Sequence, residues 1–271
     1  MLQCFQLALV TVDLPGTLRL YSEALGFRNA GGQCSWGSRI QGLGADARHL
    51  MWWLVGERKF FQLEVFEYTH PVPRPLPPDW RPCDHGWTRF GVAVDDFDAC
   101  LNGLERRGIT PFTAAVATRG HRHVAIRDPY VGVIIEIVES GRSQPQGPNV
   151  TYVTSSVSDL ESARGFYGGL LQFRILPLEG GTAQARGLPP LGPGHHEYFA
   201  RARRAEPVAR ALQRLKAAGY APPFTFENGE NICGYITDPE RALAIASIPE
   251  QLDAVYGFVA APLGFMGKHV E

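Results

Sequence analysis

Short apolar runs alternate with amphipathic stretches along the chain, and this pattern predicts strands followed by helices. The first run, Leu7–Val12, ends at Asp13, and apolar residues at helical spacing follow. A second run of this kind, Val150–Val157, leads to Asp159. An Asp that closes a strand-like run and precedes a helical pattern is typical of a helix N-cap. The sequence therefore predicts a strand, a capped helix and a further strand at both places.

These two stretches also share the spacing of their key residues. Eight positions separate the Asp from a Tyr, and six separate that Tyr from a Phe; the residues are Asp13, Tyr21 and Phe27 in one copy and Asp159, Tyr167 and Phe173 in the other. The recurrence of this spacing 146 positions further along the chain, from Asp13 to Asp159, indicates duplicated structural units.

Each half of the chain contains a second unit of related pattern. In the first half, a strand-like run at 90–94 precedes an apolar helical pattern at 97–104 that stops at Gly108. In the second half, the counterpart runs from a strand near Phe199 to a helix that stops at Gly219. An Asp-Pro turn and another apolar strand follow in both halves, at 127–136 and 237–246.

The predicted fold class is therefore α+β, with four βαβββ-type units in two modules. We expect the modules at residues 1–143 and 149–271, because the stretch from 140 to 149 is rich in Gly, Ser, Gln and Pro and lacks periodicity. The third unit is expected to be truncated, since few residues separate Phe173 from His195.

Composition narrows the class of protein further. The formal net charge of −1 and the absence of a basic run argue against nucleic acid or an anionic membrane as partner. No apolar stretch is long enough for a membrane span, and the N-terminus lacks the features of a signal peptide. The five cysteines are scattered without a CxxC pair, which favours reduced thiols and a cytoplasmic location.

Taken together, the Leu25-Gly26-Phe27 motif and the Asp-Pro turn leading to Ile135-Glu136 resemble the vicinal-oxygen-chelate superfamily. This superfamily includes glyoxalase, methylmalonyl-CoA epimerase, extradiol dioxygenases and bleomycin-resistance proteins. The resemblance implies that each module curls two units into cup-shaped mixed sheets. It also implies a divalent metal held by His, Gln or Glu from the first and fourth strand of each unit.

The resemblance places Gln6, Glu64, Arg89 and Glu136 at the four ligand positions of the first module. Arginine cannot ligate a metal, because its guanidinium stays protonated and offers no lone pair. We therefore expect no cofactor here and a charge cluster instead, in which Arg89 pairs with Glu64 and Glu136. If iron, manganese or zinc is bound after all, Gln6, Glu64 and Glu136 are its expected ligands.

The corresponding positions of the second module are Tyr152, a residue near Ala200, and Ala246. None of these is a usual ligand in this superfamily, and the second module is therefore expected to be structural or to serve as a wall or lid. An ordinary set of rim salt bridges is the alternative interpretation of Glu64, Arg89 and Glu136.

Further candidates surround the expected cup. His121 and His123 alternate on one predicted strand and so share a face, with His121 preferred as an acid or base. A solvent-facing strand explains the pair equally well. Substrate contacts are expected from His123 and Gln6, and from four residues of the cup and its rim, which are Trp53, His85, Trp87 and Tyr130.

Three functions remain open at this stage. The first is an isomerase, epimerase or lyase that transfers a proton on a small, aromatic or apolar molecule without a metal. In this reaction Glu64 or Glu136 would be the base, and Arg89 would stabilise the negative charge. His121 or His85 would return the proton. The second is a metal-dependent extradiol dioxygenase or glyoxalase-like lyase. The third is a small-molecule binding protein of the drug-resistance type. Both a monomer and a homodimer fit the sequence.

Overall fold

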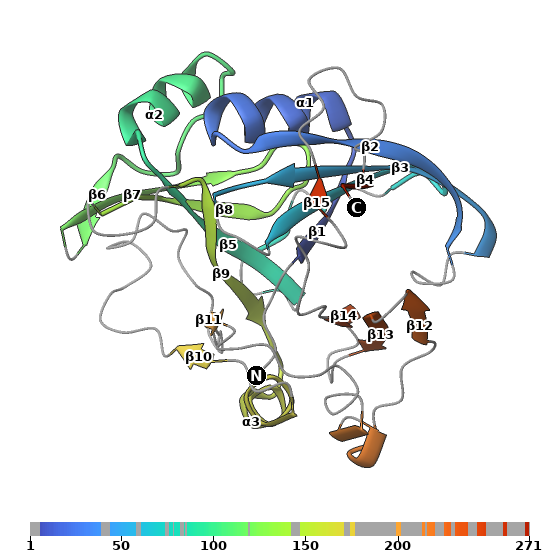
Figure 1. The fold of residues 1–271 in the computed structure, drawn as a ribbon. Coiled ribbons are helices and arrows are strands. Elements are labelled where there is room, and N and C mark those ends of the chain that lie inside the picture. Colours follow the sequence, from blue (N-terminus) through green and yellow to red (C-terminus); the bar gives the residue numbers. More distant parts are fainter. Residues whose placement is uncertain are drawn as a thin grey trace.

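Two mixed β-sheets of four and five strands, with two helical segments on one side, form the larger part of the described residues (Figure 1). The computed structural model describes residues 6–170 except 39–43, 58–60, 74–75, 78, 82–83, 85, 119 and 142–146, and beyond them 174–176, 199–201, 213–214, 216–219, 225–228, 231–237, 243–247, 257–258 and 269–270. The expected α+β class is confirmed. No helix within these ranges has the length and apolar character needed to cross a membrane.

The first sheet has four strands in the order β1-β4-β3-β2. Its strands are β1 (Gln6–Thr11), β2 (Arg28–Ser38), β3 (Gly44–Val55) and β4 (Gln62–His70). β1 and β4 are parallel, and the other pairs are antiparallel. Between β1 and β2 lie α1 (Leu14–Arg19) and the π-helical segment η1 (Leu20–Ala24). As expected, Asp13 is the N-cap, and its Oδ1 accepts a hydrogen bond of 2.8 Å from the Gly16 amide.

The second sheet repeats this strand order and adds one strand at its edge. Its order is β6-β7-β8-β5-β9, with β5 (Gly86–Val94) parallel to β8 (Ile134–Glu139). Next come β7 (His121–Arg127) and β6 (Val116–Thr118). The helix α2 (Phe97–Glu105) is capped by Asp96, which accepts from the Ala99 amide at 2.8 Å. In both units the first strand therefore lies beside the fourth, followed by the third and the second.

The added strand is β9 (Asn149–Ser156), which pairs antiparallel with β5. The sequence assigned these residues to the start of the second module, yet they complete the sheet of the first. The division at residues 143 and 149 stays a prediction. After β9 the chain continues into α3 (Leu160–Ala163) and η2 (Arg164–Leu170), and Asp159 caps α3 as expected.

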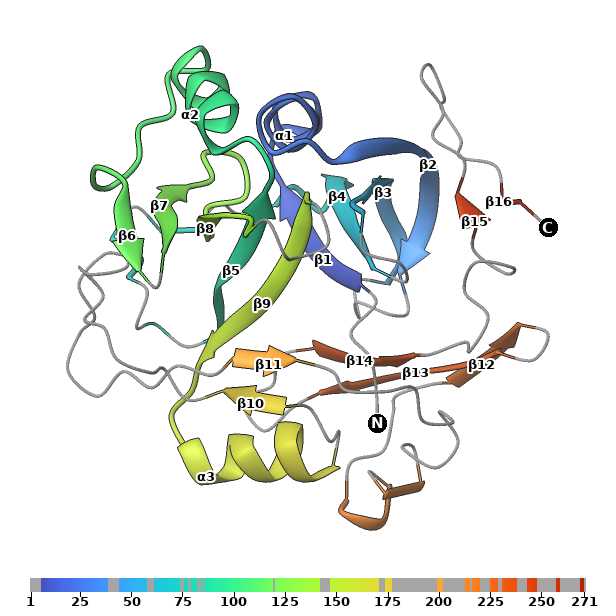
Figure 2. The same cartoon turned by 60° about the vertical axis from the view of Figure 1, so that its left-hand side comes forward.

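Most of the remaining strands, those between residues 174 and 247, lie on the far side of the sheets from α1 and α2 (Figures 1 and 2). The remaining strands pair as β10 (Arg174–Leu176) with β11 (Phe199–Arg201), β12 (Thr225–Asn228) with β13 (Asn231–Thr237) and β14 (Leu243–Ser247), and β15 (Gly257–Phe258) with β16 (His269–Val270). Residues 177–198 lie outside the described ranges, so the truncation of the third unit also stays a prediction.

One hydrophobic core joins both units of the first module. It fills the space between the helices and the sheets, with buried residues such as Leu20, Leu63, Phe90, Leu104 and Ile137. Because side chains alternate along a strand, the neighbours of these residues project from the opposite face of each sheet.

A buried hydrogen bond links the two units through the repeated Tyr and the Asp-Pro turn. The Tyr21 hydroxyl donates to Oδ2 of Asp128 at 2.8 Å, and Oδ1 of Asp128 accepts from the amides of Tyr130 and Val131 at 2.8 and 3.1 Å. Burial raises the pKa of Asp128 against the opposing effect of these bonds. Burial and the nearby Asp128 also raise the pKa of Tyr21, so its proton stays in place to be donated.

Candidate functional site

The face of the five-stranded sheet opposite α1 and α2 carries an unusual set of buried and half-buried polar side chains. We call it the Glu136 face and define it by Arg89, His123, Glu136, Tyr152 and Thr154. The strand pairing places these residues on one face, because cross-strand partners project to the same side.

Glu136 lies at the centre of this face and is fully buried. Its neighbours in register are Ala125 on β7 and Gly91 on β5, both of which are small. Oε1 of Glu136 lies 3.2 Å from Nδ1 of His123, whose side chain is 12% exposed. The structure therefore brings a buried carboxylate and a histidine at the edge of the buried region into direct contact.

Arg89 projects from the same face and is 1% exposed. It is paired with Ile134 on one side and with Thr154 on the other, and it precedes the Gly91–Glu136 pair by two positions along β5. Arg89 and Glu136 both make further contacts within the protein. Burying a guanidinium costs free energy unless other groups compensate its charge, so Arg89 depends on its contacts within the protein.

The first sheet contains the equivalent pair of positions. Glu64 on β4 is in register with Ala8, and Gln6 precedes Ala8 by two positions, just as Arg89 precedes Gly91. Glu64 is half-buried and paired with Trp53 on β3. The side chain of Gln6 lies outside the described part of the structure. Gln6 and Glu64 thus share one sheet, whereas Arg89 and Glu136 share the other.

This donor set does not fit a divalent metal. The buried guanidinium of Arg89 occupies the position equivalent to that of Gln6, and a guanidinium is a fixed cation with no lone pair for a metal. Its charge would oppose a second cation near Glu136. In the described residues, moreover, His, Cys, Asp and Glu form no group of three or more with metal-binding geometry.

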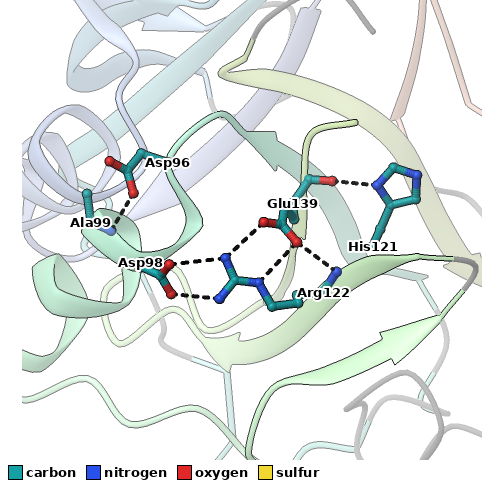
Figure 3. A network of polar contacts seen from close by, with 6 residues as sticks. All are labelled: Asp96, Asp98, Ala99, His121, Arg122 and Glu139. Carbon is teal, nitrogen blue, oxygen red and sulfur yellow. Dashed lines mark hydrogen bonds and ion pairs between the residues drawn. The ribbon is translucent and has the colours of Figure 1, made fainter. Parts of the chain in front are cut away.

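A polar network on the helix side anchors the strand that carries His123 (Figure 3). Arg122 donates to Glu139 at the end of β8, with bonds of 3.0 and 2.8 Å, and to Asp98 at the start of α2, with bonds of 2.7 and 3.2 Å. Hydrogen bonds from Arg122 lower the pKa of Asp98 and of Glu139. The network ties β7 to β8 and to α2, and so fixes the strand from which His123 extends.

His121 was the acid or base that the sequence analysis preferred, but its hydrogen bond is to Glu139 and not to Glu136. Its Nδ1 lies 3.1 Å from the backbone carbonyl of Glu139, near the outer end of the sheet (Figure 3). The histidine in contact with Glu136 is His123, which the sequence assigned to substrate contact. Side-chain alternation along β7 places both histidines on the same face of the sheet. The register of β7 against β8 then decides which of the two contacts Glu136.

Three further residues were expected to contact the substrate, namely Tyr130, His85 and Trp87. Tyr130 lies on the helix side, where its ring occupies the space beside Gly16 and its carbonyl accepts from the Val12 amide at 3.1 Å. This placement gives Tyr130 a packing role between the two units, away from the Glu136 face. His85 and the side chain of Trp87 lie outside the described part of the structure.

No pattern in the sequence pointed to His49, which is buried on β3. Its ring packs against Phe66 and Tyr68, with centroid distances of 5.5 and 5.0 Å. Within the described residues its buried Nδ1 has no hydrogen-bond partner. Burial lowers the pKa of His49 below its ordinary value of 6.5, because a charged ring loses hydration among aromatic groups.

His49 is expected to make the fold less stable in mild acid. Its folded pKa lies below 6.5, so the unfolded chain binds a proton first and the free energy of unfolding falls as the pH drops below about 6.5. Urea unfolding between about pH 7.5 and pH 5.5 measures the slope. His49→Phe should flatten it, whereas His70→Gln, at an exposed histidine paired with Asp46, should not. Equal slopes in wild type and His49→Phe would contradict this assignment.

Comparison with solved structures identifies the fold. A candidate dioxygenase from Bacillus subtilis superposes with a TM-score of 0.63 at 14% identity, covering 91% of this chain and 84% of the other. Glyoxalase I from Zea mays gives 0.55 at 14% identity, covering 91% and 92%. A mutant of that glyoxalase, E144Q, gives 0.57 at 15% identity, covering 90% and 93%.

These similarities extend over most of both chains, and they confirm the expected vicinal-oxygen-chelate fold. Neither the protein-family models nor the curated protein sequences give a match. The fold is shared with enzymes of different chemistry, so the function has to be argued from the side chains of this chain.

Proposed function

We propose that this chain is an enzyme that transfers a proton on a small molecule, as an isomerase, epimerase or lyase, through the Glu136–His123 pair. The observation that supports this proposal is the contact between a fully buried carboxylate and a histidine at the edge of the buried region. A carboxylate bonded to Nδ1 of a histidine orients the ring and fixes its tautomer, which is a common arrangement for a general base.

The roles follow from the geometry. When Nδ1–H of His123 donates to Glu136, Nε2 on the other side of the ring keeps its lone pair. Nε2 takes a proton from a carbon next to a carbonyl group, and the electron pair of that C–H bond moves to the carbonyl oxygen. The proton then returns to carbon in an isomerase or epimerase, or a leaving group departs from the neighbouring carbon in a lyase.

This assignment differs from the sequence-based expectation, in which Glu64 or Glu136 was the base and His121 or His85 returned the proton. Glu136 is closed to solvent behind His123. We therefore give proton transfer to His123 and the orienting role to Glu136. The Arg89 guanidinium provides fixed positive charge on the same face, suited to the negative charge that develops on the substrate oxygen.

A deuterium-exchange assay tests the proposal before the natural substrate is known. A panel of small carbonyl compounds with an acidic C–H bond is incubated with the protein in D₂O, and proton NMR records loss of the C–H signal. Exchange of at least one compound is expected. Because no step needs a metal, the rate should stay within about twofold after EDTA treatment.

Two results would reverse the proposal. Loss of exchange with EDTA and recovery with Fe²⁺, Mn²⁺ or Zn²⁺ would favour the metal-dependent dioxygenase or lyase. Stoichiometric binding of compounds without any exchange would favour a binding protein.

A further inference from the structure

Arg127, at the end of β7, places a further cation on the Glu136 face. Its cross-strand partner is Ile134, two positions before Glu136 on β8. Because side chains alternate along a strand, Arg127 lies on the same face as His123, four positions away on β7. At the rise of a β-strand, the Cα atoms of Arg127 and His123 are roughly 13 Å apart. The guanidinium therefore lies beyond one end of the Glu136–His123 pair.

The side chain of Trp80 holds this guanidinium in place. Trp80 comes from the segment between β4 and β5, and it packs against Ala125 and Ile134. Ala125 is in register with Glu136, so Trp80 lies over the Glu136 face. The guanidinium carbon of Arg127 is 4.9 Å from the centroid of the Trp80 ring, and Nη2 donates to the Trp80 carbonyl oxygen at 3.2 Å. These two contacts fix the orientation of a side chain that is otherwise flexible.

Arg127 is oriented in this way, but no carboxylate of the described residues neutralises its charge. A guanidinium has five N–H groups, and the Trp80 carbonyl engages one of them. The other donors of Arg127 are therefore available to a ligand. Arg127 and Trp80 are partly exposed, and the side chain of His123 is 12% exposed. A small molecule can reach all three residues from solvent without a movement of the chain.

An oriented guanidinium with spare N–H groups is suited to a carboxylate, because its planar fork matches the two carboxylate oxygens. The distance along β7 then restricts the rest of the ligand. A molecule that contacts both Arg127 and Nε2 of His123 needs several bonds between its carboxylate and the carbon that reacts. A 2-oxo acid is too short, because its carboxylate is attached to the carbonyl carbon itself.

We propose that Arg127 binds the carboxylate of the substrate, that Trp80 is its positioning residue, and that the substrate is a small oxo acid. Several bonds separate the carboxylate of this acid from the carbon that reacts at His123. The substrate class rests on the proposed function, whereas binding of a carboxylate at Arg127 does not. Holding the charged end at Arg127 brings the other end of the molecule to the catalytic pair.

Oxo acids and their neutral amides test the subsite. Pyruvate, 4-oxopentanoate and 6-oxoheptanoate are each compared with the corresponding amide by NMR titration of the full-length protein. At least one of the two longer acids should bind about tenfold more tightly than its amide, because the guanidinium recognises the charge and both oxygens. Pyruvate and pyruvamide should differ by less than about threefold, since neither spans from Arg127 to His123.

Substitutions at the two residues locate the bound carboxylate. Arg127→Gln should reduce the preference for the acid to about twofold or less, and Arg127→Lys should keep part of it because the charge remains. Trp80→Leu should weaken binding of the acid several-fold and leave the amide unchanged, since Trp80 acts through the guanidinium. Trp80→Phe should keep most of the preference, because a ring remains for the stacking contact. A purely structural role of Trp80 would weaken acid and amide alike.

Arg122→Gln is the matched control, because Arg122 lies on the same strand and binds Asp98 and Glu139 on the other side of the sheet. It should keep the wild-type preference for the acid. The subsite is refuted if neither longer acid binds better than its amide, or if the preference survives in Arg127→Gln. A preference that depends on Arg127 in a protein without deuterium exchange would refute the proposed function and leave the subsite standing.

Discussion

Replacing Glu136 by Gln is expected to slow the deuterium exchange by about 100-fold or more, because the amide no longer holds His123 with its proton on Nδ1. A Gln side chain can donate to Nδ1 as well as accept from it, which permits the tautomer with the proton on Nε2. That tautomer has no base on the side of the ring that faces away from Glu136. The measurement is the initial exchange rate of the best compound of the panel in D₂O.

The matched substitutions separate a catalytic pair from a general loss of structure. His123→Gln should slow exchange as much as Glu136→Gln, and the double variant should be little slower than either, since the two residues act as one unit. His121→Gln is the control on the same strand and face, and its rate should stay within about threefold of wild type. A Glu136→Gln variant that folds and exchanges at the wild-type rate would exclude the pair from catalysis.

Replacing Asp128 by Ala is expected to lower the free energy of unfolding by about 3–5 kcal/mol, because three donors lose their buried acceptor at once. These donors are the Tyr21 hydroxyl and the amides of Tyr130 and Val131. The loss should appear in urea unfolding as a lower midpoint with an unchanged slope.

Tyr21→Phe provides the matched comparison for this second effect. It removes one hydroxyl and leaves Asp128 with its two amide donors, so the expected loss is only about 1–2 kcal/mol. If both variants lost the same amount, the turn would contribute nothing of its own and the link between the units would depend on the Tyr hydroxyl alone.

Local patterns in the sequence were sufficient for much of the fold. Asp13 and Asp159 cap helices as predicted, because capping depends on a few neighbouring residues. Such features need no knowledge of what lies beside the strand. Arg89 and Glu136 were brought together by the resemblance to the vicinal-oxygen-chelate superfamily, and the pairing of β5 with β8 places them on one sheet face.

The remaining features of the candidate site depend on pairing between distant segments. Thr154 and Tyr152 gain their place beside Arg89 and Gly91 only because β9 pairs with β5. No periodicity within residues 149–156 reveals that partner. The choice between His121 and His123 had the same origin, since the register of β7 against β8 decides which ring contacts Glu136.

The place of β9 also affects the order in which the protein can fold during synthesis. Until residues 149–156 have left the ribosome, β5 presents an open strand edge, and such edges recruit other chains. A chain that stalls or is cut at the apparent linker would keep this edge exposed and lose Thr154 with it. A boundary suited to domain exchange or truncation therefore lies after Ser156, where the sheet is complete.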